Sequence, residues 1–314
     1  MLYAVIADIH GNYHALQAVL EDARKAGAEQ FLFLGDYVTD FPFTKEIMET
    51  LLGLKNAVFI SGNREQYMDS LDPAQRYWEQ YAGLFVTRDA LGEKNLAWMR
   101  DLPRSLHLTT PDGACSMFLE HEFPVSVDPK GQKRPASGEL DELFPKRDAT
   151  HEEVAQYVRE SFLADPQLPK FLCGINAQVF LHGHSHLQYA VDVGGTLFLN
   201  PGSCGLPLDH QTGAPYTLLH YRSGDFRVEE RRVPYDVEAF VDAVTRSPEH
   251  RKTEGWDQLN IWQLRAARDH NRVFFRFLNE EQRRTHPQTA QEQNEAFRTT
   301  LFLTREYYEK ERVR

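Results

Sequence analysis

The chain has few cysteines, no long apolar run and no excess of basic residues. Its three cysteines, Cys115, Cys173 and Cys204, are odd in number and well separated, which argues against a disulfide framework. No stretch approaches the roughly 20 apolar residues of a membrane span. The first apolar run stops at Asp8, too soon for a signal peptide. These absences predict a cytoplasmic protein that does not enter a membrane.

The charge balance limits the partners that we expect. Lys and Arg total 35 against 46 Asp and Glu, a formal net charge of −11. Proteins that hold nucleic-acid backbones rely on clustered Lys and Arg, so a broad nucleic-acid surface is not expected. A small phosphorylated ligand in a locally positive site is compatible with this balance. With 314 residues, 41% of them hydrophobic, the chain can bury one large core, or one core with an appendage.

The first sixty residues read as alternating strands and helices. The apolar runs 2–7, 31–36 and 57–63 are rich in strand-forming residues, and residues 14–26 carry apolar side chains at helical spacing before Gly27. Strands and helices that alternate at this spacing favour parallel βαβ units. We therefore expect a parallel sheet at the start of the chain.

The pattern changes after this first unit. Residues 105–121 read as a hairpin with Asp112-Gly113 at its turn, and residues 179–233 read as further strands. Residues 66–102 are predicted to be mostly helical, with four aromatic residues assigned to packing: Tyr77, Trp78, Tyr81 and Phe85.

Two polar or helical segments complete the chain. The stretch 128–149 is predicted to be a locally basic loop, and a capping box at 150–153 to open a helix after it. From about residue 236 the pattern is helical and amphipathic. We therefore expect a core domain over residues 1–235 and a helical C-terminal extension over residues 236–314. The extension is rich in aromatic residues, for which packing is the default, and it could cap the sheet, form a homodimer or cover the active site.

Polar side chains with metal-binding chemistry follow the predicted strands. In an open parallel sheet the carboxyl ends of neighbouring strands meet at one edge, where ligands usually bind. Mixed imidazole and carboxylate ligands suit Mn, Fe, Zn or Ni better than Mg or Ca alone. Seven ligands are too many for one ion with an open position, but they fit two ions that share a carboxylate. The residues in question are Asp8, His10, Asp36, Asn63, His121, His184 and His186.

These positions form a set of motifs that resembles a known family. DIHGN (8–12), GD (35–36), GN (62–63), a strand-end His121 and GHSH (183–186) are similar to the five-block signature of the calcineurin-like metallophosphoesterases. The segment GGTLFLNPGSCG (194–205) resembles a strand and loop of the bacterial phosphodiesterase and phosphatase branch. The resemblance covers residues 1–235. It implies an α/β fold of the calcineurin-like kind, an αββα sandwich with two central mixed sheets.

The resemblance also implies roles for the residues. The first metal ion would be held by Asp8, His10 and His186, and the second by Asn63, His121 and His184, with Asp36 bridging. Members of the family activate water with two divalent metal ions and hydrolyse phosphate esters. The implied function is hydrolysis of a phosphate ester or anhydride of a small molecule or nucleotide, with manganese among the expected metals. General chemistry agrees with this implication, because two ions about 3.5–4 Å apart can lower the pKa of bound water and stabilise the attacking and leaving oxygens.

Arg64 departs from the family pattern, in which a histidine usually follows the asparagine. Guanidinium has a pKa above about 12 and cannot act as a general acid near neutral pH. It can bind phosphate bidentately and offset charge in the transition state, so Asn63 and Arg64 are the predicted catalytic residues. The alternative is that Arg64 pairs with Glu65 or another acid and organises the loop. His14 is a second predicted substrate contact or proton donor, unless it is an ordinary residue at the start of a helix.

The loss of a positioned acid predicts a narrower chemistry. Such a group contributes about 10²–10⁴-fold to the rate, most for poor leaving groups, so we expect substrates with good leaving groups. A second departure is His121-Glu122, where the family usually has His-Gly. The alternative function is a catalytically weak or inactive protein-binding scaffold of the same fold, with the C-terminal extension as the partner surface. Metal content separates these hypotheses, because a scaffold would bind none.

Overall fold

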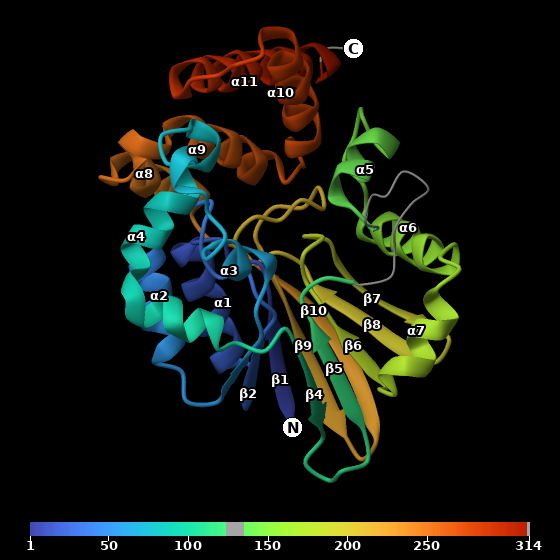
Figure 1. Ribbon diagram of the computed structural model, residues 1–314. Helices are drawn as coiled ribbons and strands as arrows, with labels where there is room; N and C mark the ends of the chain where they lie inside the picture. The colour runs from blue at the N-terminus through green and yellow to red at the C-terminus, as the bar shows by residue number, and fades with distance from the viewer. Residues whose placement is uncertain (124–134, 313–314) are drawn as a thin grey trace.

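The computed structural model describes residues 1–123 and 135–312. Two five-stranded β-sheets pack face to face, and helices cover their outer faces, as Figure 1 shows. This arrangement confirms the predicted αββα sandwich with two mixed sheets. The expected loop at 128–149 lies partly outside the described residues.

The first sheet contains the three N-terminal strands in parallel and two later antiparallel ones. Its strands in spatial order are β10 (Asp225–Val233), β9 (Ala214–Arg222), β1 (Leu2–Ile6), β2 (Gln30–Phe33) and β3 (Ala57–Phe59). β1 and β2 pair in parallel, with Val5 opposite Leu32, and β2 pairs in parallel with β3. The carboxyl ends of β1, β2 and β3 therefore lie side by side, as the sequence pattern predicted.

The second sheet is also mixed. Its strands in spatial order are β4 (Ser105–Thr109), β5 (Ser116–Glu120), β6 (Val179–Leu181), β8 (Thr196–Pro201) and β7 (Gln188–Val193). β4 and β5 form the predicted antiparallel hairpin. β5, β6 and β8 run in parallel, so the ends of β5 and β6 also lie side by side.

The alternation of side chains along the strands builds two layers of core. Tyr3 and Val5 of β1 point between the sheets, where they join Leu119 and Leu181 of the second sheet. Ala4 and Ile6 lie on the opposite face and pack against helices. Because both faces of β1 are buried, its sequence is a continuous apolar run.

Helices cover the outer faces of the two sheets (Figure 1). The first sheet is covered by α1 (Tyr13–Lys25), α2 (Thr44–Leu52) and α4 (Glu79–Arg100), whose buried residues share one cluster with the sheet. The second is covered by α6 (His151–Leu163) and α7 (Leu168–Ile175). The capping box at the start of α6 is present, since the Thr150 hydroxyl accepts from the Glu153 backbone and the Glu153 carboxylate accepts from the Thr150 backbone.

The stretch 66–102 is mostly helical, as predicted, but in pieces: α3 (Asn63–Tyr67) is followed by irregular chain and by the short helix η1 (Pro73–Gln75), and α4 is broken at Gly92. Two local predictions are corrected by the structure. Tyr77, assigned to packing, is 76% exposed. Within the predicted loop at 128–149, the described part contains α5 (Ser137–Leu143). Packing against the C-terminal extension favours this helix, since Ser137 donates to the Asp269 carboxylate.

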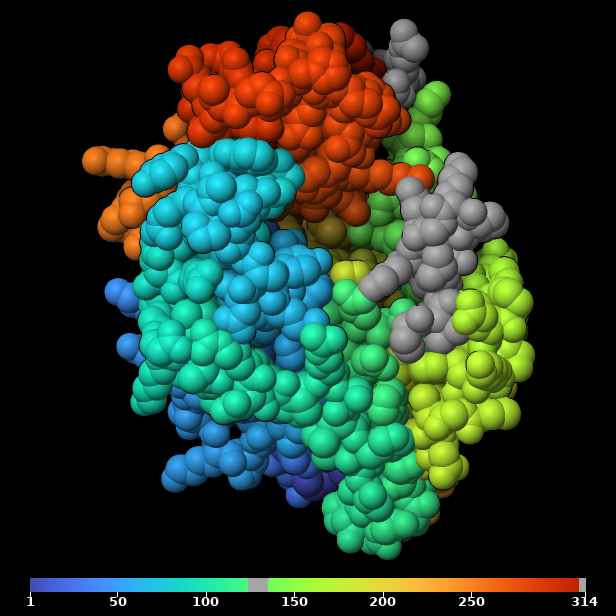
Figure 2. Space-filling view, in the orientation of Figure 1, coloured from blue at the N-terminus to red at the C-terminus, as the bar shows by residue number. Residues whose placement is uncertain are grey.

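The C-terminal helices lie over the edge where the strand ends converge (Figure 1). They are α8 (Val237–Arg246), α9 (His250–Ala266), α10 (Asn271–Thr285) and α11 (Ala290–Arg312). Phe240 of α8 and Leu264 of α9 pack with Phe41 and Leu206 from loops after β2 and β8. The visible face is hollowed between the segment around α3, α5 and these helices (Figure 2). No helix in the described part of the chain has an apolar stretch long enough to span a bilayer.

Candidate metal centre

The seven residues predicted as metal ligands converge at the strand ends. Each lies within a few residues after the end of β1, β2, β3, β5 or β6. Asp8, His10, Asp36 and His121 are all no more than 3% exposed, and Asn63 and His184 are half-buried. Residues that span 178 positions of the chain thus share one buried cluster, although no metal ion is part of the structure.

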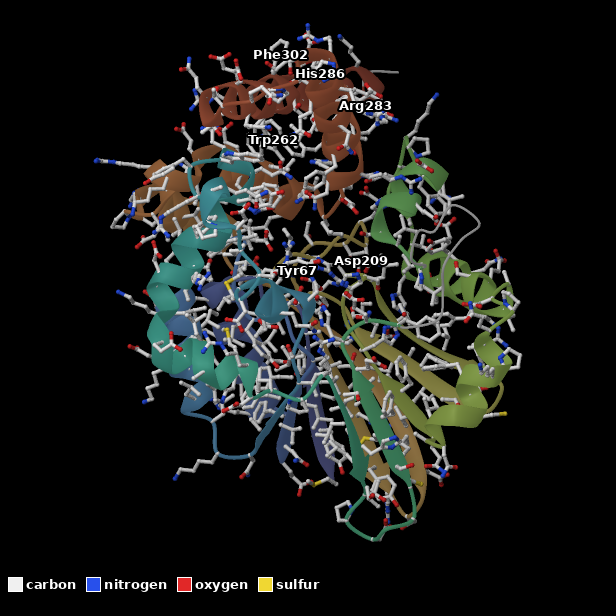
Figure 3. The ribbon with its side chains drawn as sticks, in the orientation of Figure 1. Tyr67, Asp209, Trp262, Arg283, His286 and Phe302 are labelled. Carbon is white, nitrogen blue, oxygen red and sulfur yellow. The ribbon has the colours of Figure 1, made fainter. Side chains whose placement is uncertain are left out.

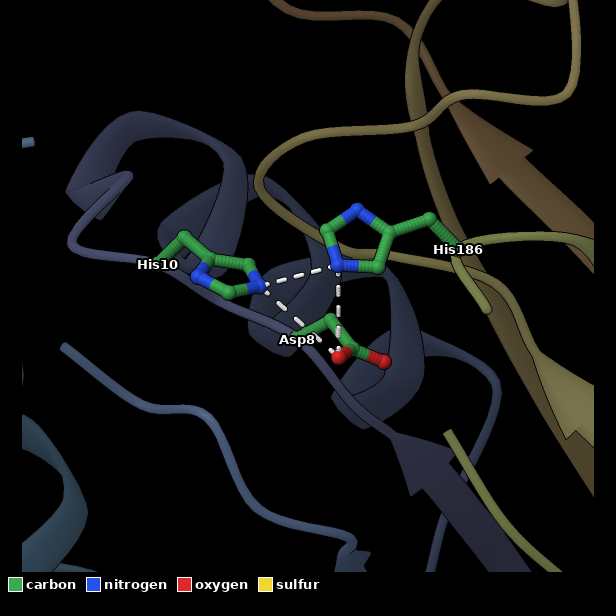
Figure 4. Close-up of side chains that lie close together, drawn as sticks. All are labelled: Asp8, His10 and His186. Atoms are coloured by element: carbon green, nitrogen blue, oxygen red, sulfur yellow. Dashed lines mark hydrogen bonds and ion pairs between the residues drawn. The ribbon is translucent and has the colours of Figure 1, made fainter. Parts of the chain in front are cut away.

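One group comprises Asp8, His10 and His186 (Figure 4). The Nε2 atoms of the two histidines are 3.0 Å apart. Oδ1 of Asp8 lies 3.7 Å from Nε2 of His10 and 3.5 Å from Nε2 of His186. Three ligand atoms therefore surround one point, as a single cation requires.

The second group surrounds Asn63. Its Oδ1 lies 3.0 Å from Nε2 of His121 and 3.0 Å from Nδ1 of His184. Asp36 lies between the two groups: Oδ1 is 3.5 Å from Nε2 of His121, and Oδ2 is 3.8 Å from Nε2 of His10. Asp8 is also close to His121, at 3.9 Å. The carboxylate of Asp36 is therefore placed to serve both groups.

Polar contacts outside the cluster fix the tautomers of three imidazoles. Nδ1 of His121 lies 2.6 Å from the Leu34 carbonyl, and Nδ1 of His186 lies 2.7 Å from the Leu206 carbonyl. Nδ1 of His10 lies 2.7 Å from a carboxylate oxygen of Asp40. Because these oxygens only accept, each Nδ1 carries a proton, and in its neutral form each ring directs an Nε2 lone pair into the cluster.

The inward-facing atoms are therefore mostly hydrogen-bond acceptors. Lone pairs of His10 and His186 face each other, and that of His121 faces the oxygens of Asn63 and Asp36. Acceptors so close together repel unless positive charge lies among them, either as protons or as metal ions. The donor set therefore fits divalent cations that prefer nitrogen and oxygen ligands.

The pKa values of two histidines in the cluster also show that the cluster favours positive charge. Burial alone would lower the pKa of His10, but hydrogen bonds with Asp40 and Asp8 outweigh it and raise the pKa to about 9. Burial likewise opposes charge on His121, where the neighbouring Asp36 raises the pKa to about 9. Burial and the nearby His121 lower the pKa of His184 to about 3. The carboxylates thus attract cationic charge into the cluster.

The backbone is strained at the ligand positions. Asp8, His10, Asp36, His184 and His186 all have positive φ, between 50° and 67°. The left-handed region is sparsely populated by residues other than glycine, and such strain costs about 1–3 kcal/mol per residue. The ends of β1, β2 and β6 turn sharply in this way, which directs side chains from several strands at one point.

Two glycines leave room for the carboxylates. A Cβ on Gly62 would lie 2.2 Å from Oδ1 of Asp36, and a Cβ on Gly183 would lie 2.6 Å from Oδ2 of Asp8. Both distances are far below van der Waals contact. The glycines of the GN and GHSH motifs are therefore required by the close approach of the neighbouring ligand.

Asp40 is part of the site although the sequence analysis did not single it out. Its Oδ2 lies 2.7 Å from Nδ1 of His10 and 3.3 Å from Nη2 of Arg64. Its Oδ1 accepts a hydrogen bond from Nε1 of Trp256 at 2.9 Å, and its carbonyl accepts from Asn260 at 3.0 Å. Asp40 thus connects a candidate ligand to α9. No sequence signal linked it to Trp256, which lies 216 positions away.

Glu65 was also missed as a positioning residue. Its buried carboxylate accepts from the backbone N–H groups of Asp36, Tyr37 and Gly62, at 2.8–2.9 Å. These bonds tie the GD turn to the GN turn. They also leave Glu65 engaged with the backbone, so it is not the partner of Arg64.

The loop after β8 supports Asp8 and His186. The Ser203 hydroxyl donates to the carbonyl of Asp8 at 2.7 Å and accepts from the backbone of Leu206 at 2.9 Å. The carbonyl of Leu206 in turn holds Nδ1 of His186. This loop positions two candidate ligands, Asp8 and His186.

Arg64 and His14 occupy different surroundings. The Arg64 side chain is 25% exposed, and its charge is balanced by Asp40 and by Asp36, whose Oδ2 is 3.9 Å from Nε. His14 packs against the rings of Phe43 and of Phe240 in α8. No contact given by the described residues joins His14 to the cluster, so we leave it out of the proposed site. The role predicted for it stays a prediction.

The fold and the cluster define an α/β sandwich protein with a candidate metal centre at its strand ends. The chain belongs to the calcineurin-like phosphoesterase family, whose model matches residues 1–188. This confirms the resemblance seen in the motifs. Membership of this family supports the assignment of the protein as a metal-dependent phosphoester hydrolase.

Relatives and solved structures extend the comparison. The uncharacterized protein MJ0912 of Methanocaldococcus jannaschii is 25% identical over 266 residues, which cover 78% of this chain and 93% of that protein. A metallophosphoesterase from Sphaerobacter thermophilus has a similar structure (TM-score 0.56, 20% identity), with 85% of this chain and all of that chain covered. So does protein PH1004 of Pyrococcus horikoshii OT3 (TM-score 0.55, 21% identity; 82% and 96% covered). At these identities the two structures establish the fold alone.

Proposed function

We propose that the protein is a phosphoesterase that works with two divalent metal ions on a phosphate ester or anhydride of a small molecule or nucleotide. The observation that carries this proposal is the set of facing acceptors. Three Nε2 lone pairs and the oxygens of Asp8, Asp36 and Asn63 meet in one buried cluster. A cluster built only for stability would pair such acceptors with donors.

The assignment of ligands follows the two groups in the structure. The first ion is assigned to Asp8, His10 and His186, the second to Asn63, His121 and His184, and Asp36 is assigned to both. Ligands of this mixed kind suit Mn, Fe, Zn or Ni. Two such ions would supply a lowered pKa for water and would offset the charge that develops around phosphorus.

Arg64 is proposed to bind the substrate phosphate. Its Nε is buried and has no hydrogen-bond acceptor among the described residues, while Asp40 holds Nη2 from one side. A guanidinium held in this way can donate a hydrogen bond to a phosphate oxygen and offset negative charge in the transition state. Asn63 is proposed to act beside it as a metal ligand that faces the substrate.

The experiment measures metal content and hydrolysis together. Wild type, Asp36→Asn and the control Asp225→Asn, at an exposed position, would be loaded with Mn²⁺ and assayed on an aryl phosphate monoester and the matching diester. We expect metal-dependent turnover in wild type and the control and its loss in Asp36→Asn. The ratio of monoester to diester turnover would show which chemistry is preferred. Absence of both turnover and bound metal would overturn the proposal in favour of the scaffold.

A further inference from the structure

A cavity of about 300 Å³ opens beside Arg64, between the segment that joins α3 to α4 and the C-terminal helices α9 and α10. Its wall includes Arg64 and Asp40, both of which contact the candidate metal ligands. In Figure 3, Tyr67 lies at the level of the strand ends and below the C-terminal helices. A substituent on a phosphate bound at Arg64 can therefore reach this cavity.

The rest of the wall combines aromatic rings with amides. The aromatic side chains are Tyr67, Tyr81, Trp256 and Phe275, and the amides belong to Gln75 and Gln80. The rings come from both sides: Tyr67 and Tyr81 from the core, and Trp256 and Phe275 from the C-terminal helices. Neither glutamine amide makes a side-chain hydrogen bond to another described residue.

The wall contributed by α9 is held in place before any ligand binds. Trp256 is only 9% exposed, and its indole donates to Asp40. Gly83 of α4 allows the close approach, because a Cβ there would lie 3.3 Å from the indole ring. At the start of α4, the Glu79 backbone donates to Asn294 of α11, and Asn294 donates to the carbonyl of Tyr77. A fixed wall loses little conformational freedom when a ligand binds.

We propose that this cavity, called the base pocket from here on, binds a nucleobase, so that the substrate of the enzyme is a nucleotide. The inference rests on the proposed phosphoesterase function and names its substrate class. Flat heteroaromatic rings stack on aromatic side chains, and their edges carry the donors and acceptors that amides match. A volume of about 300 Å³ is at the small end of ligand pockets and fits one base.

Other substituents fit the base pocket less well. A purely apolar group, such as a lipid chain or a plain aryl ring, would bury the Gln75 and Gln80 amides without partners, which costs affinity. A phosphopeptide needs an extended surface for several residues, whereas this cavity is bounded by the core on one side and the C-terminal helices on the other. A base satisfies both the rings and the amides.

The first test compares substrates that differ only in the base. Hydrolysis by the metal-loaded enzyme would be measured for AMP, GMP, UMP and CMP against ribose 5-phosphate. For diester chemistry, the p-nitrophenyl ester of thymidine 5′-phosphate would be compared with methyl p-nitrophenyl phosphate. Stacking of one base on aromatic side chains corresponds to about tenfold or more in affinity. We expect kcat/KM to be at least about tenfold higher for one nucleotide than for its base-free counterpart.

The second test places the effect in the base pocket. Tyr81→Leu removes one ring of the wall, and Tyr77→Leu is the matched control, because Tyr77 is 76% exposed and does not line the cavity. Tyr81→Leu should reduce the preference for the nucleotide about tenfold, while Tyr77→Leu should keep the wild-type preference. An equal loss for nucleotides and base-free esters in Tyr81→Leu would refute the assignment of the pocket.

A binding measurement separates this inference from the proposed function. The four nucleoside monophosphates and ribose 5-phosphate would be titrated calorimetrically into wild type, Tyr81→Leu and Tyr77→Leu with the metals removed, so that no hydrolysis is needed. Tighter binding of a nucleotide that Tyr81→Leu loses supports the base pocket even if no ester is hydrolysed, in which case the proposed function fails alone. Hydrolysis without any advantage for a nucleotide overturns the base pocket alone.

Discussion

Asp40 provides the sharpest test of how the C-terminal extension supports the candidate metal centre. Its two carboxylate oxygens serve different donors: Oδ2 lies 2.7 Å from Nδ1 of His10, and Oδ1 accepts from Trp256 at 2.9 Å. In Asp40→Asn one of the two oxygens becomes an NH₂ group. Whichever way the amide lies, one N–H donor loses its acceptor and faces another donor.

The magnitude follows from these contacts. A buried donor left without an acceptor costs about 1–3 kcal/mol, and the lost negative charge no longer balances Arg64 at 3.3 Å. If the NH₂ group faces His10, the ring is driven to the tautomer whose Nε2 carries a proton and cannot bind a metal ion. Changes to such outer partners of metal ligands typically cost 10–100-fold in metal affinity. We expect Asp40→Asn to bind Mn²⁺ with an affinity about 10–100-fold lower than wild type.

The assay is a competition titration of Mn²⁺ against a chelator, with wild type and Asp89→Asn, an exposed carboxylate on α4, as controls. A double variant adds a stricter condition. Trp256→Phe removes the donor at Oδ1, so the amide of Asp40→Asn can then turn its oxygen toward His10. The double variant should therefore bind Mn²⁺ more tightly than Asp40→Asn alone, a non-additive result. Unchanged Mn²⁺ affinity in Asp40→Asn, or strictly additive losses, would refute this reasoning.

Three further predictions address the backbone, the substrate and the fold. Gly62→Ala places a Cβ 2.2 Å from Asp36, so hydrolysis should fall about 100-fold, as for a misplacement of about 1 Å; normal turnover would contradict the packing argument. Arg64→His adds a group that can donate a proton and should favour alkyl over aryl esters relative to wild type; equal slowing of every ester would count against it. Burial raises the pKa of Asp257 to about 6, above its unfolded value of about 3.9, so its contribution to stability is present below about pH 4 and is lost as pH rises through about 6. The free energy of unfolding of Asp257→Asn relative to wild type should therefore rise by up to about 3 kcal/mol between about pH 4 and pH 8. Urea unfolding of both proteins without metal measures this difference, and a difference that does not change with pH would disprove the prediction.

The cluster itself was predictable from the sequence because it depends on local rules. Parallel strands place their carboxyl ends together, and each of Asp8, Asp36 and Asn63 lies within a few residues of the end of such a strand. The close approach of the carboxylates to neighbouring strand ends leaves no room for a Cβ there, and the motifs have glycine at these places, Gly62 and Gly183. Order along the chain and residue type were therefore sufficient to assemble the candidate ligands.

The supporting residues were not predictable in this way. In the sequence Asp40 is one acidic residue of a loop among others. Its role depends on its contacts with His10 on one side and Trp256 on the other. Helix α5 is short and polar, and contacts such as Ser137 to Asp269 favour it where the sequence resembled a loop. Tyr77 and Tyr81 are neighbouring aromatics of the same kind, yet one is exposed and the other lines a cavity. Tertiary contacts decide these cases, and periodicity does not report them.

The boundary expected at residue 235 separates the motif-bearing segment from the rest, but the contacts cross it at the site. Trp256 holds Asp40 and lines the base pocket, and Asn260 binds the Asp40 backbone. Arg268 is paired with Asp141 of α5 and Asp148 beyond it. The apolar cluster of Phe41, Leu206 and Phe240 joins the loops of the core to α8. The C-terminal helices therefore belong to the candidate active site, because they position a candidate metal ligand, His10, through Asp40 and form one wall of the proposed base pocket.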